Sequence, residues 1–202
     1  MDAEAADATR PPPEPGPAWP AAERLSDAAV VLARPDPAQA PAVFRLAADP
    51  ALWVDVPEAG RTTSVTAQRD DLERFAAHWD RYGFGYWLAW SATGDDDPEE
   101  AVGGDLLGLG GLRWLWWRDD WVLNVYIRLA ARAQGRGIAR RLLETGIERL
   151  DDSLDIATPV VVRTRPTNES MVGLARRIGF VDAGTEEREL GTYRVLVREL
   201  GT

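Results

Sequence analysis

The chain has 202 residues, of which 45% are hydrophobic, and it carries a formal net charge of −10 at pH 7. It contains no cysteine and, because all 23 of its basic residues are arginines, no lysine. This composition excludes disulfides, thiolate nucleophiles, lysine Schiff bases and lysine-dependent phosphate loops, and a single histidine argues against a zinc or iron site. We expect one domain, no bound metal and a cytoplasmic location.

The N-terminal segment differs in composition from the rest of the chain. Residues 1–23 are rich in proline, alanine and acidic residues, which predicts a disordered tail followed by a domain over residues 24–202. This tail contains five acidic residues and one arginine, and residues 94–100 (GDDDPEE) contain five more acidic residues. The remainder is therefore nearly neutral, which argues against nucleic-acid binding, and no stretch of about 18 uncharged apolar residues indicates a membrane span.

The first half of the domain predicts two helices followed by an antiparallel meander. A strand is expected over residues 27–33, and helices over 36–49 and 66–83. Runs rich in apolar and aromatic residues then predict three consecutive strands, separated by the acidic loop and by a turn at RDD, over residues 84–91, 106–117 and 121–129.

The second half alternates helices and strands before a final hairpin. Helices are expected over residues 136–150 and 168–179, with a buried strand at 159–165 between them. Two last strands are expected over residues 180–187 and 192–200. The order predicts an α/β domain built on a mixed, mostly antiparallel central sheet flanked by helices.

A glycine-rich turn joins the third meander strand to the next helix. Gly135 and Gly137 lie where that helix begins, and exposed N–H groups at a helix N-terminus are suited to binding an anion. A Walker loop would need a lysine, and a dinucleotide fingerprint would need a small residue where the chain has Arg140. The turn therefore belongs to another kind of phosphate site.

Residues 134–139 (QGRGIA) match the Q/R-x-x-G-x-G/A turn of the GNAT acyltransferase superfamily. A second match is the superfamily's N-x₁₀-GF segment, which begins at Asn168 and ends at Gly179 and Phe180. The chain resembles this superfamily over residues 27–200, and residues 121–143 resemble its branch of ribosomal-protein N-acetyltransferases (the Rim-type branch).

The resemblance implies a fold with a splayed strand pair that holds acetyl-CoA. The turn would bind the diphosphate, the free backbone groups of the third meander strand would pair with the pantetheine arm, and Asn168 would hold the arm or the splayed strand. Asn168 could equally act as a helix N-cap only. The residues expected to bind the cofactor are Ile127, Leu129, Arg132, Gln134, Gly135, Arg136, Gly137, Ile138, Ala139 and Asn168.

The resemblance gives weaker guidance on catalysis. Relatives often carry a glutamate base on the strand before the turn, where this chain has Asn124, and a tyrosine or serine acid on the downstream helix, where it has Ala175 and Met171. Candidates are therefore Asn124 ordering a water, Ser170 beside Met171, His78 as a base, or a carboxylate from the N-terminal helices. For His78 the alternative is a histidine with no catalytic role on the surface of its helix.

Together these features predict an acetyl-CoA-dependent N-acetyltransferase that transfers directly to a primary amine, on a protein N-terminus or a small molecule. A non-catalytic acyl-CoA sensor or assembly module is the alternative, because the usual catalytic positions are replaced. Seven of the nine tryptophans gather near residues 79–90 and 114–121, where we expect core packing, with an acceptor pocket or a homodimer face around RWLWWRDDW as alternatives.

Overall fold

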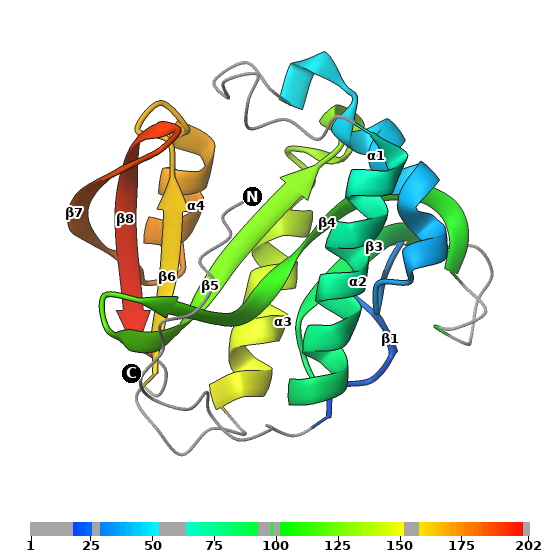
Figure 1. Cartoon of the computed structure of the whole chain (residues 1–202), viewed down its shortest axis with the longest axis horizontal. Coiled ribbons are helices and arrows are strands. Elements are labelled where there is room, and N and C mark those ends of the chain that lie inside the picture. Colours follow the sequence, from blue (N-terminus) through cyan, green and yellow to red (C-terminus); the bar gives the residue numbers. More distant parts are fainter. Residues whose placement is uncertain are drawn as a thin grey trace.

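The computed structural model describes residues 18–25, 29–52, 64–92, 98, 102–151 and 158–199. One eight-stranded sheet runs through this part of the chain, with helices on both faces (Figure 1). The strands are β1 (Ala22–Arg24), β2 (Val30–Ala33), β3 (Tyr86–Ala92), β4 (Val102–Trp117), β5 (Asp120–Leu129), β6 (Pro159–Thr164), β7 (Val181–Arg188) and β8 (Gly191–Glu199). The helices are α1 (Ala40–Ala47), α2 (Val65–Tyr82), α3 (Ile138–Asp151) and α4 (Glu169–Arg177), with short 3-10 turns η1 (Pro37–Gln39), η2 (Pro50–Leu52) and η4 (Ala131–Ala133).

The strand order across the sheet is β1-β2-β3-β4-β5-β6-β8-β7. β5 and β6 are parallel and are joined through α3, and the other neighbours pair antiparallel. This confirms the predicted α/β fold, its mixed and mostly antiparallel sheet, and the β3-β4-β5 meander. No helix in the described ranges is long and apolar enough to cross a membrane.

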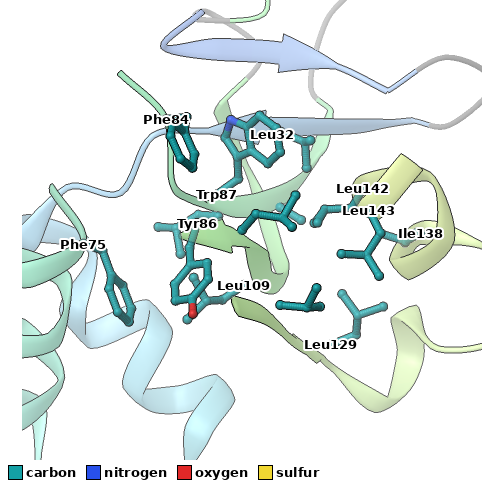
Figure 2. Close-up of a cluster of buried hydrophobic side chains, with 14 of the residues drawn as sticks. Leu32, Phe75, Phe84, Tyr86, Trp87, Leu109, Leu129, Ile138, Leu142 and Leu143 are labelled. Atoms are coloured by element: carbon teal, nitrogen blue, oxygen red, sulfur yellow. The ribbon is translucent and has the colours of Figure 1, made fainter. Parts of the chain in front are cut away.

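Successive residues of β3 show which helices cover which face of the sheet. The Tyr86 ring lies 5.0 Å from Phe75 of α2, whereas its neighbour Trp87 points to the other face, toward Gly146 of α3. Figure 2 shows Phe75 and Tyr86 on one side of this core and Ile138, Leu142 and Leu143 of α3 on the other. We call these two sides the α2 face and the α3 face; α4 lies with α3 (Figure 1).

Local sequence explains where α2 and the β4–β5 hairpin begin and end. The Ser64 side chain accepts a hydrogen bond from the Ala67 N–H at 3.1 Å, and Gly83 ends the helix with a φ of 77°. The hairpin turns through Arg118 and Asp119, whose φ values of 50° and 62° suit a tight two-residue turn. Ordinary capping and turn rules therefore place these elements.

The N-terminal boundary predicted at residue 24 is wrong for residues 18–23, which belong to the folded domain. Trp19 is 6% exposed and stacks on Trp87 with ring centroids 4.5 Å apart. Three residues further on β1 begins, and there Glu23 accepts two hydrogen bonds from Arg149 of α3 at 2.6 and 2.9 Å. A single tryptophan between prolines has no periodicity that would predict its burial. The predicted disorder of residues 1–17 lies outside the described residues.

Other elements differ from the prediction mainly at their ends. The helix expected over residues 36–49 is the turn η1 followed by α1, and α3 begins at Ile138 rather than Arg136, because two glycines at positive φ precede it. β4 begins at Val102, earlier than expected. Most of the acidic loop before it lies outside the part of the chain that the structure describes.

Candidate functional site

The glycine turn lies between the end of β5 and the start of α3. Gly135 and Gly137 have φ values of 72° and 76°, in the left-handed region that side chains rarely adopt. The Gln134 side chain donates from Nε2 to the Leu129 carbonyl at 3.1 Å, which closes the turn onto the end of β5. The first N–H groups of α3 follow directly and, as at any helix start, have no acceptor within the helix. The turn can therefore present several N–H groups to an anion.

Four arginines surround this turn, and three of them contact other groups of the protein. Arg132 donates to the Leu106 carbonyl at 2.9 Å, Arg140 pairs with Glu144 at 2.7 Å, and Arg141 donates to the Arg136 carbonyl at 2.8 Å. Arg141 thereby braces the turn from inside α3, while the Arg136 side chain is exposed. The cluster adds positive charge to the N-terminal end of a helix, where the helix dipole already favours anions.

The strands β5 and β6 separate just before this turn. Their parallel pairing covers Leu123–Val160, Asn124–Val161 and Val125–Val162, and no further ladder pair links the described residues of the two strands. Figure 1 shows them diverging from this point toward their C-terminal ends. The last four residues of β5 thus border an opening in the sheet.

The backbone of β5 faces this opening at alternate residues. The Ala130 N–H donates to the Leu107 carbonyl at 2.8 Å, so the ladder pair of Leu129 with Gly108 is not directly hydrogen-bonded. In an antiparallel ladder such residues turn their N–H and C=O groups away from the partner strand. Leu129 and, two residues earlier, Ile127 therefore direct their backbone groups toward the side that β6 has left.

Asn168 lies at the far side of the same opening. Its Oδ1 caps α4 by accepting from the Met171 N–H at 3.1 Å, and its Nδ2 donates to the Thr164 hydroxyl at 3.0 Å. Thr164 is the last residue of β6 and is buried. The side chain is therefore both a helix cap and a tie to the splayed strand.

The α2 face carries a group of buried and half-buried polar side chains at the level where β5 and β6 separate. The Asn124 amide donates to the Tyr86 hydroxyl at 2.9 Å, and the Arg113 guanidinium lies 5.5 Å from the Tyr86 ring centroid. Asn124 and Arg113 are ladder partners on β5 and β4. Burial raises the pKa of the Tyr86 phenol, so this hydroxyl keeps its proton and remains neutral.

Tyr126 and Asp71 complete this polar group. The Tyr126 ring lies 5.5 Å from that of Tyr86, and Asp71 projects from α2 with only 7% of the residue exposed. Sequence reasoning named a carboxylate from the N-terminal helices in general terms and missed Asp71, Tyr86 and Arg113 individually. The signal that could have found Asp71 is its place in the buried helical stripe of α2 (Gln68, Asp71, Leu72, Phe75, Trp79 and Tyr82).

His78 is held by backbone groups on both sides of its ring. Nδ1 lies 2.8 Å from the Phe84 carbonyl, and Nε2 lies 3.0 Å from the Trp114 N–H. The first contact needs a proton on Nδ1 and the second needs a lone pair on Nε2, so this pattern fits one neutral tautomer. Burial lowers the pKa of His78 to about 4. With both nitrogens engaged, the ring has no site left for a substrate proton, and this geometry favours a structural role for His78 over that of a candidate base.

The structure does not bring Ser170 together with Asn124. Ser170 is exposed on the first turn of α4, on the α3 face, whereas Asn124 points to the α2 face. Met171 beside it is half-buried, and Ala175 is fully buried. The expected catalytic residues therefore divide between the two sides of the sheet. Within the described ranges, no three His, Asp or Glu side chains lie together in a way that could hold a metal ion.

Comparison with known proteins agrees with this geometry. A family model described as an acetyltransferase (GNAT) domain matches residues 29–181. No curated protein matches the sequence significantly.

Solved structures with the same fold cover most of the chain at low sequence identity. The microcin C7 self-immunity acetyltransferase MccE, solved with acetyl-CoA and AMP, has a TM-score of 0.69 and 14% identity over 90% of this chain and 97% of its own. A Salmonella typhimurium acetyltransferase that modifies the N-terminal serine of ribosomal protein L7/L12 has a TM-score of 0.66 and 17% identity, over 88% and 98%. A GNAT-family acetyltransferase from Bordetella pertussis has a TM-score of 0.65 and 20% identity, over 84% and 94%.

Proposed function

Because the chain belongs to the acetyltransferase (GNAT) domain family and is an acetyl-CoA-dependent N-acetyltransferase, we propose that it transfers the acetyl group directly to a primary amine on a protein N-terminus or a small molecule. The observation that carries this proposal is the opening between β5 and β6, which ends at the glycine turn. Beyond the last ladder pair of these two strands the glycine turn and the polar group of the α2 face lie on the two sides of the sheet, so we place the two reactants here, one arriving from each face.

The pantetheine arm of acetyl-CoA fits the exposed edge of β5. Its two amide groups can pair with the backbone of Ile127 and Leu129, as an added strand would. The Leu129 carbonyl already accepts from Gln134, so Ile127 is the better placed of the two for both donating and accepting. Asn168 would act from the other side of the opening by fixing Thr164 at the end of β6.

The diphosphate fits the turn from Gln134 to Ala139. The N–H groups of Gly135, Gly137, Ile138 and Ala139 would donate to its oxygens, assisted by the dipole of α3. Arg132 and Arg136 would add charge from the rim of the turn, Arg136 with the greater freedom because its side chain is exposed. This arrangement uses glycine for its conformation and backbone amides for recognition.

Direct transfer follows from the chemistry that this chain offers. The sequence has no cysteine that could carry an acyl group between two half-reactions. In direct transfer a neutral amine attacks the thioester carbon, the C–S bond breaks, and the departing thiolate takes up a proton. The sulfur belongs on the cofactor side, where Ser170 of α4 is our candidate proton donor, and Asn124 on the opposite side would orient the acceptor or a water.

The acceptor class rests on similarity and charge. The Salmonella typhimurium relative modifies a protein N-terminus, which supports a peptide acceptor for this chain as well. The net charge of −10 favours encounter with cationic amines of any size. A homodimer and a cytoplasmic location stay predictions from the sequence.

Thiol release from acetyl-CoA tests the proposal when it is measured with two kinds of acceptor. We expect release above the acceptor-free rate with eight-residue peptides that begin with serine or alanine, or with the polyamine spermidine. Mass spectrometry of the product should show a gain of one acetyl group on the amine. Saturable acetyl-CoA binding with no transfer to any acceptor of a broad amine panel would instead support an acyl-CoA sensor.

A further inference from the structure

The residues described so far leave the proton of the acceptor amine without a destination. An attacking amine must lose a proton as the amide forms, and Asn124 is an amide that cannot accept one. His78 has both ring nitrogens engaged by backbone groups. Burial keeps the Tyr86 phenol protonated. If a side chain rather than a water takes this proton on the α2 face, it must therefore be another residue.

Asp71 is a carboxylate buried on this face. The buried side chains of α2 from Leu72 to Tyr82 are apolar or aromatic, whereas the two buried residues nearest the start of the helix, Gln68 and Asp71, are polar. Helix positions that face a sheet are normally apolar, and a carboxylate in such a position costs free energy of burial. Such a cost is typical of a residue kept for chemistry rather than for packing.

The contacts of α2 place Asp71 beside the opening in the sheet. His78 contacts the Trp114 backbone, and Phe75, one turn earlier, packs against Tyr86. Tyr86 pairs with Gly111 of β4, which in turn pairs with Tyr126 of β5, so Asp71, one further turn in the same direction, is expected at or beyond the row that contains Tyr126. Tyr126 is the first residue of β5 beyond its pairing with β6. The negative charge of Asp71 acts on the Tyr126 hydroxyl, which agrees with this placement.

Charged groups from three elements surround the Asp71 carboxylate. Arg74 on α2 forms an ion pair with it, Asp70 precedes it, and Arg113 on β4 and Tyr126 on β5 face it. Burial raises the pKa of Asp71, and the two arginines oppose that rise. The side chain keeps 11% of its surface exposed, so it can be reached. Two nearby guanidinium groups also lower the pKa of an amine bound there, which favours the neutral nucleophile.

We propose that Asp71 is the catalytic carboxylate of the acceptor side, which accepts a hydrogen bond from the acceptor amine and takes its proton. The amine nitrogen forms the new C–N bond to the thioester carbon, the C–S bond breaks, and the sulfur leaves as a thiolate that is protonated on the cofactor side. Asp71 then releases the amine's proton to solvent. This inference rests on the proposed acetyl transfer to an amine.

The test compares Asp71→Asn with Asp70→Asn, which makes the same substitution at the exposed neighbouring residue. Thiol release is measured with acetyl-CoA and the best acceptor among the serine and alanine peptides and spermidine. We expect Asp71→Asn to lower kcat about 100-fold or more while calorimetric acetyl-CoA binding is unchanged. Asp70→Asn should stay within about threefold of wild type in both assays.

The outcomes separate this inference from the proposed function. If wild type releases thiol and Asp71→Asn does so within threefold of it, the role of Asp71 is overturned and the proposed function stands. If wild type transfers acetyl to no amine, both fall together. If Asp71→Asn does not fold, Arg74→Gln provides the test instead. Loss of that guanidinium raises the pKa of Asp71, so the rise of kcat/KM on the acidic side of the pH profile should move to higher pH. An unshifted limb contradicts the proposal.

Discussion

The cofactor side and the acceptor side of this domain are built from different parts of the chain. On the cofactor side, the recognition that we propose comes from backbone groups of β5, the glycine turn and the first turn of α3, all within residues 127–139. On the α2 face, the polar group draws one side chain each from α2, β3 and β4 and two from β5 (Asp71, Tyr86, Arg113, Asn124 and Tyr126).

This difference explains why only one side can be read from the sequence. A backbone site depends on glycines at fixed spacing and a helix start, which are local properties. A site made of side chains depends on which strands pair and in which register, and that is decided by the whole fold. The predictions below separate the scaffold, the cofactor side and the acceptor side.

The largest effect, a loss of folding stability, is expected from Trp19→Ala, at a residue that belongs to neither the cofactor side nor the acceptor side. Removing a buried tryptophan that stacks on Trp87 should cost about 3–5 kcal/mol of folding free energy and lower the Tm by roughly 10 °C. Trp116→Ala is the matched control, because Trp116 is only half-buried, and should cost clearly less. Acetyl-CoA affinity measured below the Tm should be unchanged in both. An equal loss of stability in the two variants would contradict the packed N-terminal segment.

The second-largest effect is expected from a glycine substitution in the turn on the cofactor side. Gly135→Val should weaken acetyl-CoA binding at least 100-fold, about 2.7 kcal/mol, because a side chain there projects over the turn. Gly184 in β7 is the matched control: its φ of 91° is also positive, and at neither glycine would an added Cβ meet an atom within 4 Å. Calorimetry should therefore show binding by Gly184→Val that equals wild type. Equal binding by both variants would remove the turn from the cofactor site.

His78 gives a pH test of the acceptor side. Its pKa of about 4 in the folded chain is below the ordinary 6.5, so the unfolded chain binds the proton more tightly. The contribution of neutral His78 to the free energy of unfolding is fully present above pH 6.5 and is lost as the pH falls toward 4. The loss between pH 7 and pH 5 is about 2 kcal/mol. Denaturant unfolding of His78→Gln should lack this loss. A limb of kcat/KM near pH 6.5 that disappears in His78→Gln would restore the histidine base.

The smallest effect is expected at Asn168, which borders the opening. Asn168→Ala should cost about 1 kcal/mol by removing the cap of α4 and the donor to Thr164. Asn168→Asp keeps the cap but not the donor, so chemical denaturation should show most of the stability recovered. Acetyl-CoA binding that is weaker in both variants would show that the tie to β6 matters to the cofactor. Normal binding in both would limit Asn168 to capping.

Much of the fold follows from local sequence patterns. The runs of apolar and aromatic residues in the meander, the Ser64 cap, and the glycines that precede α3 each specify their element locally. Trp19 could not be predicted, because its burial depends on a groove formed by Trp79, Phe84 and Trp87. The role of His78 was equally hidden, since both of its backbone partners are set by tertiary packing.

Calorimetric titration of the full chain with acetyl-CoA tests the central claim most directly. The account predicts saturable binding near one molecule per chain, because the β5 edge, the glycine turn and the start of α3 form one site. At about 1 mM acetyl-CoA, only binding with a free energy weaker than about −4 kcal/mol would go undetected. Absence of heat at this concentration would contradict the proposed cofactor site.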